Sequence, residues 1–63
     1  MKDWILNEPI SDRLSVVLRK WSTDNHTTYA VHYYDKTTGG YHSGFYGRLG
    51  EAIACFNERI NLT

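Results

Sequence analysis

Residues 28–35 read Thr-Tyr-Ala-Val-His-Tyr-Tyr-Asp and open a stretch in which two aromatic segments lead into an amphipathic one. Within Tyr29-Ala-Val-His-Tyr-Tyr34, and again from Tyr41 to Tyr46, tyrosine and histidine occupy odd and even positions alike. Because successive side chains of a strand point to opposite faces, these residues lie on both faces of a sheet. One helix covers only one face, so the sequence predicts an aromatic face that is left open. Such a face points to binding rather than to catalysis.

The predicted fold is α+β, with three antiparallel strands packed on one carboxy-terminal helix in the order β-β-β-α. The first strand is expected from Leu14 to Trp21, because leucine, valine and tryptophan favour strands. The second runs from Thr27 to Asp35. Glycines in the loop 35–40 supply the positive φ that a hairpin demands, and the third strand follows from Tyr41 to Tyr46.

The period of the sequence changes to that of a helix from Gly47 onward, and a helix is predicted over residues 48–61. Its apolar stripe covers the sheet and comprises Leu49, Ile53, Phe56 and Ile60. Gly50 lies in the first turn and weakens the helix by roughly 1 kcal/mol relative to alanine.

The 63 residues form one domain, 1–63, which buries only about 60% of the surface of its unfolded chain. Residues 1–12 are predicted to be an amino-terminal arm, because Asn7-Glu8-Pro9 disfavours a continuous helix. A short helical turn beginning at Pro9 is an alternative.

Charge and cysteine content narrow the classes of partner and compartment. Seven basic and seven acidic residues give no net charge. The chain therefore lacks the excess of positive charge that is typical of a protein that holds nucleic acid by its phosphates. Cys55 is the single cysteine, which excludes an internal disulfide and fits a reducing compartment. Neither a leader nor a run of about 18 apolar residues is present, so we expect a cytoplasmic protein without a membrane span.

The side chains on the predicted open face follow from which face the helix covers. If the helix packs on Tyr29, Val31 and Tyr33, the opposite face carries residues of the types that anchor interfaces. The expected binding residues are Arg19, Trp21, His32, Tyr34 and His42. Loop length decides whether His42 or Tyr41 joins this face, since a slip of one residue swaps the sides. Alternatively, the arm with Trp4, Ile5 and Leu6 covers the face.

Catalysis and metal binding are the weakest functional classes for this sequence. The three histidines and Cys55 lack the close pairing of structural zinc sites, so no metal is expected. Cys55 lies near the packed stripe, where cysteines are usually inert. We therefore expect no catalytic residue, no cofactor and no enzyme.

The segment from Tyr29 to Asn57 resembles the plant GCC-box-binding domain and the related amino-terminal domains of phage and transposon integrases. The resemblance lies in the aromatic-led strand, the glycine-containing loop, Gly44-Phe45-Tyr46 and a Glu-Ala-x-x-x-aromatic helix that starts at Glu51. It implies a three-stranded sheet backed by one helix. It also implies that the free sheet face reads DNA, with the reading positions near Arg19, Trp21, His32, Tyr34 and His42.

The sequence therefore predicts a small non-enzymatic protein-binding module. Its partner is expected to be another protein or a second copy in a homodimer, docked on the aromatic sheet face. Small neutral domains of this kind are often regulators or inhibitors, such as those carried by phages and other mobile elements. The alternative is a nucleic-acid-binding domain that uses the same face.

Overall fold

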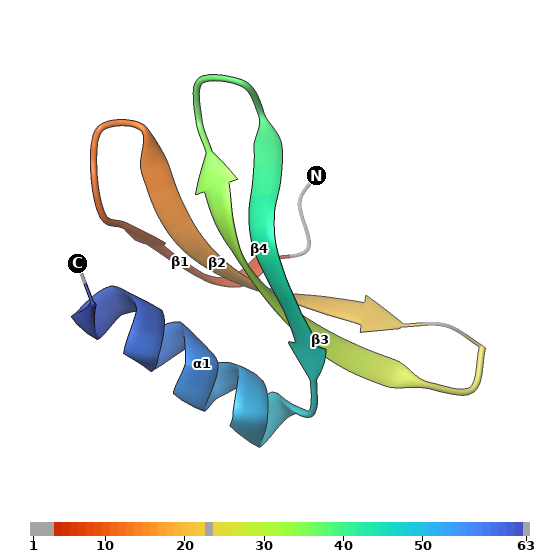
Figure 1. Cartoon of the computed structure of the whole chain (residues 1–63). Helices are drawn as coiled ribbons and strands as arrows, with labels where there is room; N and C mark the ends of the chain where they lie inside the picture. Colours follow the sequence, from red (N-terminus) through yellow and green to blue (C-terminus); the bar gives the residue numbers. More distant parts are fainter. Residues whose placement is uncertain (1–3, 23, 63) are drawn as a thin grey trace.

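The computed structural model describes residues 4–22 and 24–62, which form one antiparallel sheet with a helix on one face (Figure 1). The strands are β1 (Trp4–Pro9), β2 (Leu14–Ser22), β3 (Thr27–Asp35) and β4 (Gly40–Gly47), and the helix is α1 (Leu49–Asn61). They lie in the sheet in chain order, each antiparallel to the next. The α+β class and the carboxy-terminal helix are thus confirmed.

The sheet has four strands rather than the three expected, because the predicted arm contains β1. Trp4–Pro9 pairs with β2 along the outer edge, where Pro9 lies opposite Ser15. Proline is tolerated there because a strand at the edge leaves one side of its backbone unpaired. The chain then turns at Ser11, whose Oγ accepts hydrogen bonds from the backbone N–H groups of Arg13 and Leu14 at 3.2 and 2.9 Å. No helical turn forms at Pro9; the strand ends there.

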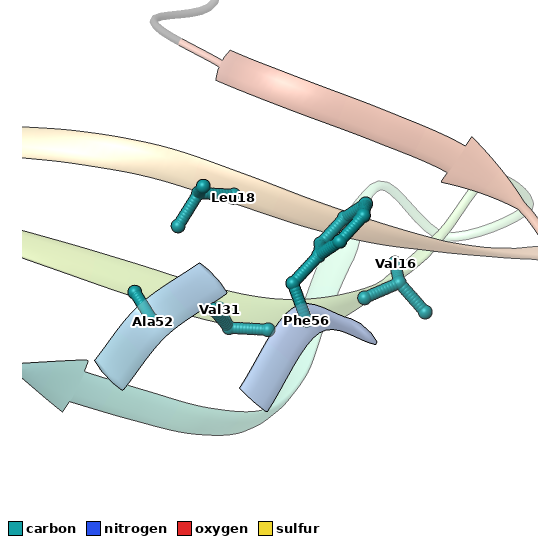
Figure 2. Packing of buried hydrophobic residues seen from close by; sticks show 5 residues of the cluster. All are labelled: Val16, Leu18, Val31, Ala52 and Phe56. Atoms are coloured by element: carbon teal, nitrogen blue, oxygen red, sulfur yellow. The ribbon is translucent and has the colours of Figure 1, made fainter. Parts of the chain in front are cut away.

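The core lies between α1 and the central strands β2 and β3. Five buried side chains form it, and Figure 2 shows the ring of Phe56 reaching from the helix toward β2: Val16, Leu18, Val31, Ala52 and Phe56. Tyr29, Tyr33 and Phe45 pack around this cluster from β3 and β4. Burying one such aromatic or aliphatic side chain stabilises the fold by about 1.5–3 kcal/mol.

The helix meets the sheet along a stripe that differs from the predicted one. Phe56 is buried and Ile60 is half-buried, as expected, but Leu49 and Ile53 are 42% and 39% exposed. The small side chain of Ala52 faces the sheet instead and lets the helix approach closely. The apolar stripe of the sequence is therefore wider than the face that the core uses.

One extra residue in β4 changes which of its side chains face the helix. Val31 pairs with Phe45, whereas Tyr33 pairs with His42, so Ser43 and Gly44 together lie opposite His32. This is a β-bulge, and Ser43 has a positive φ of 54°. Without the bulge, strict alternation from Tyr41 would put Phe45 on the open face. With it, Phe45 joins the core and Tyr46 is on the open face.

Candidate functional site

The open face is the side of the sheet that points away from α1. Cross-strand pairing aligns its side chains in rungs: Ser15 with Tyr34 and Tyr41, Val17 with His32, Arg19 with Ala30 and Tyr46, and Trp21 with Thr28. Trp4 of β1 lies opposite Arg19 and joins this face. β1 therefore contributes a ring to the face in addition to extending the sheet.

Six rings form an unbroken chain of contacts across the open face, which we call the aromatic row. In order, its members are Trp4, Tyr34, Tyr41, His32, Tyr46 and Trp21. The ring centroids of successive members lie 4.9, 5.3, 5.0, 5.5 and 5.6 Å apart. All five contacts are tilted or edge-to-face, which are the arrangements that aromatic rings prefer. The rings therefore hold one another in place.

Small residues beneath the row allow the rings to meet. Ala30 is fully buried between Arg19 and Tyr46, its neighbours on the two flanking strands. At Gly44 an added Cβ would lie only 3.0 Å from the ring of His32 and 3.2 Å from that of Tyr46. The glycine is therefore required by the two rings that pack over it.

Arg19 and His32 form the polar centre of the open face. The Nε–H of Arg19 donates a hydrogen bond of 3.3 Å to Nε2 of His32, and the guanidinium carbon lies 5.0 Å from the ring centroid of Tyr41. Burial lowers the pKa of His32, and the positive charges of Arg19 and Arg59 lower it further. His32 is therefore a neutral ring whose Nε2 accepts a hydrogen bond.

The structure brings together four of the five predicted binding residues. Arg19, Trp21, His32 and Tyr34 share the open face. His42 does not, because it pairs with Tyr33 on the helix side of the sheet.

Tyr41 takes the place on the open face that was predicted for His42. Nε2 of His42 lies 3.8 Å from a carboxylate oxygen of Asp35, which also accepts a hydrogen bond of 3.1 Å from Nε of Arg13. That hydrogen bond lowers the pKa of Asp35, against the opposing effect of burial. His42 thus belongs to a polar cluster that ties the β1–β2 turn to the β3–β4 hairpin.

The open face combines exposed rings with hydrogen-bond donors. Trp21, Tyr46 and Tyr41 are 51%, 49% and 40% exposed. None of the described strand residues on this face carries a carboxylate. Glu8 and Asp35 are on the opposite side by register, and Glu51 and Glu58 are on the helix. The described strand residues of this face therefore offer N–H and O–H groups and a guanidinium, but no anion.

The expected arm covers the open face only in part. Trp4 lies over it and donates a hydrogen bond of 3.2 Å from its indole N–H to the hydroxyl of Tyr41. Leu6 instead pairs with Leu18 on the helix side, and Ile5 lies in a bulge of β1. The sequence signal for this strand is Trp4-Ile5-Leu6, whose composition favours a strand as much as a packing arm.

The described residues enclose no cavity. They also hold no cluster of three or more histidine, cysteine or acidic side chains suited to a metal ion. Within the same ranges, no helix has the length and apolar character that crossing a membrane requires. Comparisons of the chain with protein-family models, with curated proteins and with solved structures found no match.

Proposed function

We propose that this chain is a non-enzymatic protein-binding module and that its open face is the docking surface. The observation that carries the proposal is the aromatic row, of which Trp21, Tyr46 and Tyr41 remain about half exposed. Trp, Tyr and Arg are the residue types that contribute most to protein interfaces. Arg19 lies among them.

Mutual packing of the rings supports docking as the role of this face. A side chain that is already fixed by its neighbours loses little conformational freedom when a partner covers it, which favours affinity. The chain of five ring contacts from Trp4 to Trp21 provides this fixation. By analogy of size and charge with known small domains, the module is a cytoplasmic regulator or inhibitor of the kind that mobile elements carry.

Nucleic-acid binding is the second candidate, and the lack of carboxylates among the described residues of the open face favours it. Single strands stack their bases on aromatic side chains, but such sites also track the phosphates with a positively charged groove. Here one guanidinium lies on the face, and the chain as a whole has no net charge. Protein docking needs no further cations and is therefore preferred.

Affinity capture with matched variants tests the proposal. The immobilised protein, its Trp21→Ala and Tyr46→Ala variants, and a Leu49→Ala control are exposed to an extract of the cells that produce the chain. Leu49 is as exposed as Tyr41 but lies on the helix. We expect at least one protein to be retained by the parent and the control and lost from both face variants. Identical retention by all four proteins would contradict the proposal.

Two further measurements distinguish the remaining partners. Light scattering over a concentration series detects a homodimer, whose mass would fall to that of the monomer in Trp21→Ala if the partner is a second copy. Titration with a mixed-sequence oligonucleotide at two salt concentrations detects nucleic acid, whose binding falls steeply with salt.

A further inference from the structure

We propose that the segment docked on the open face is proline-rich and adopts the polyproline II conformation. This inference rests on the proposed function and adds to it the chemistry of the partner.

The hydrogen-bonding capacity of the face matches such a segment. Among the described residues, the indole N–H of Trp21 and the hydroxyl of Tyr46 have no protein partner. The hydroxyl of Tyr41 accepts from Trp4 and keeps its own hydrogen to donate. A proline-rich segment has the opposite character, because proline has no N–H and polyproline II leaves its carbonyl groups without internal hydrogen bonds. The N–H and O–H groups of the face can therefore donate hydrogen bonds to the carbonyl groups of the segment, which has few N–H groups of its own.

The shape of the exposed rings also suits a proline-rich segment. Trp21 and Tyr46 meet at an interplanar angle of 61° with centroids 5.6 Å apart, so the two half-exposed rings form a corner rather than a flat surface. Proline-rich segments dock against aromatic side chains, and their preformed backbone keeps the entropy cost of binding low.

The edges of the sheet disfavour the main alternative, in which a partner adds a strand. The outer edge of β1 carries Pro9 and a bulge at Ile5. The outer edge of β4 is interrupted by the bulge at Ser43 and Gly44. Bulges and proline are the devices that prevent pairing at sheet edges. A partner therefore meets the face rather than an edge, and a face suits polyproline II better than an extended strand.

The charge of the face disfavours an anionic ligand. Arg19 is the one cationic side chain on the described part of the face, and it is already engaged with His32 and the ring of Tyr41. A phosphorylated or strongly acidic segment is recognised by clusters of arginines. The neutral proline-rich segment needs none.

Amide and indole NMR of the isotope-labelled full chain tests the inference, with a capped oligoproline of about ten residues as the probe. We expect the indole signal of Trp21 and the amide signals of Tyr41 and Tyr46 to shift on titration to several millimolar peptide. A glycine-serine peptide of equal length should leave them in place. Trp21→Ala should weaken binding about tenfold, as for the loss of one anchor residue.

Two variants show whether binding depends on the hydroxyl of Tyr46 and whether it is specific to the open face. Tyr46→Phe keeps the ring but removes the hydroxyl, and we expect it to bind less tightly than the parent. Leu49→Ala, on the helix, should bind as the parent does. The amide spectrum of each free variant reports its fold, so a loss of binding is scored only on a chain with parental dispersion.

The outcomes distinguish this inference from the proposed function. If the oligoproline shifts no open-face signal while Trp21→Ala still loses a captured protein, the proline-rich partner is wrong and the docking face stands. If the oligoproline shifts nothing and the face variants capture as the parent does, both are wrong. If an oligothymidine of about ten nucleotides shifts these signals and the oligoproline does not, the face binds nucleic acid and the inference is overturned.

Discussion

The imidazole of His32 makes the stability of the fold depend on pH. It is buried at the centre of the aromatic row and accepts a hydrogen bond from Arg19. Burial and two guanidinium groups lower its pKa below the ordinary 6.5, so the folded state favours the neutral ring. The unfolded chain takes up the proton first as the pH falls. Stability is therefore full above pH 6.5 and decreases below it.

We expect the free energy of unfolding to fall by less than about 1.4 kcal/mol per pH unit as the pH drops from 6.5 toward 5, because one group takes up one proton. His32→Gln, which does not titrate, should show a flatter profile in chemical denaturation over this range. Asp35 stabilises the fold above pH 3.8, because its pKa is lowered. This stabilisation is lost on protonation as the pH falls below 3.8, so Asp35 does not affect the slope between pH 6.5 and 5. Equal slopes for parent and His32→Gln would contradict this assignment.

Two glycine substitutions are expected to act in opposite directions. A Cβ at Gly44 would lie 3.0 Å from a ring carbon of His32, whereas a Cβ at Gly50 meets nothing within 4 Å. Gly44→Ala should destabilise the fold by about 1–3 kcal/mol, as crowding of a packed site does. Gly50→Ala should stabilise it by about 0.5–1 kcal/mol, because alanine favours the helix. Thermal unfolding measures both; a neutral Gly44→Ala would mean that the row of rings is looser than described.

Three of the four strands could be located from the pattern of the sequence. The segments predicted from Leu14 to Trp21, Thr27 to Asp35 and Tyr41 to Tyr46 match β2, β3 and β4 to within a residue at each end. The side-chain pattern and the turn residues of these segments are local signals, and they suffice to locate the three strands. β1 was not predicted because Asn7-Glu8-Pro9 disfavours a continuous helix and the segment before it was expected to be a packing arm. Pro9 is acceptable in β1 because this strand lies at the edge of the sheet.

The bulge of β4 explains why one binding position could not be predicted. Alternation along Tyr41 to Tyr46 gives two possible faces, and the extra residue at Ser43 changes the choice in the middle of the strand. Gly44 inside the predicted strand is a signal for a bulge, but the change of face also depends on the pairing with β3. Four predicted binding residues therefore share the open face, while Tyr41 and not His42 completes it.

The helix provides a test of which apolar residues form the core. Phe56 is 6% exposed and Ile53 is 39% exposed, although both lie on the apolar stripe of the sequence. Phe56→Ala should cost about 3–5 kcal/mol, whereas Ile53→Ala should cost less than about 1 kcal/mol. Urea denaturation measures the difference. Equal losses would place Ile53 in the core and contradict the observed orientation of α1.

The two faces of the sheet differ in what packs on them. The helix covers one face (Figure 1) and forms the core with it. The other face is ordered by ring contacts and by the hydrogen bonds from Arg19 to His32 and from Trp4 to Tyr41. Trp21, Tyr46 and Tyr41 are 40–51% exposed, so folding removes only part of their apolar surface from water, and a partner that covered them would bury the rest. Their exposure is the physical reason to expect a partner.

Radical footprinting with mass-spectrometric readout tests the docking face most directly, because the partner does not have to be identified first. The full chain is oxidised alone and in an extract of the cells that produce it, and the reactivity of each exposed side chain is compared. The proposed docking face predicts that Trp21, Tyr46 and Tyr41 lose reactivity in the extract, while Leu49 and Ile53 on the helix keep theirs. Unchanged reactivity of the three rings, or protection confined to the helix, would contradict it.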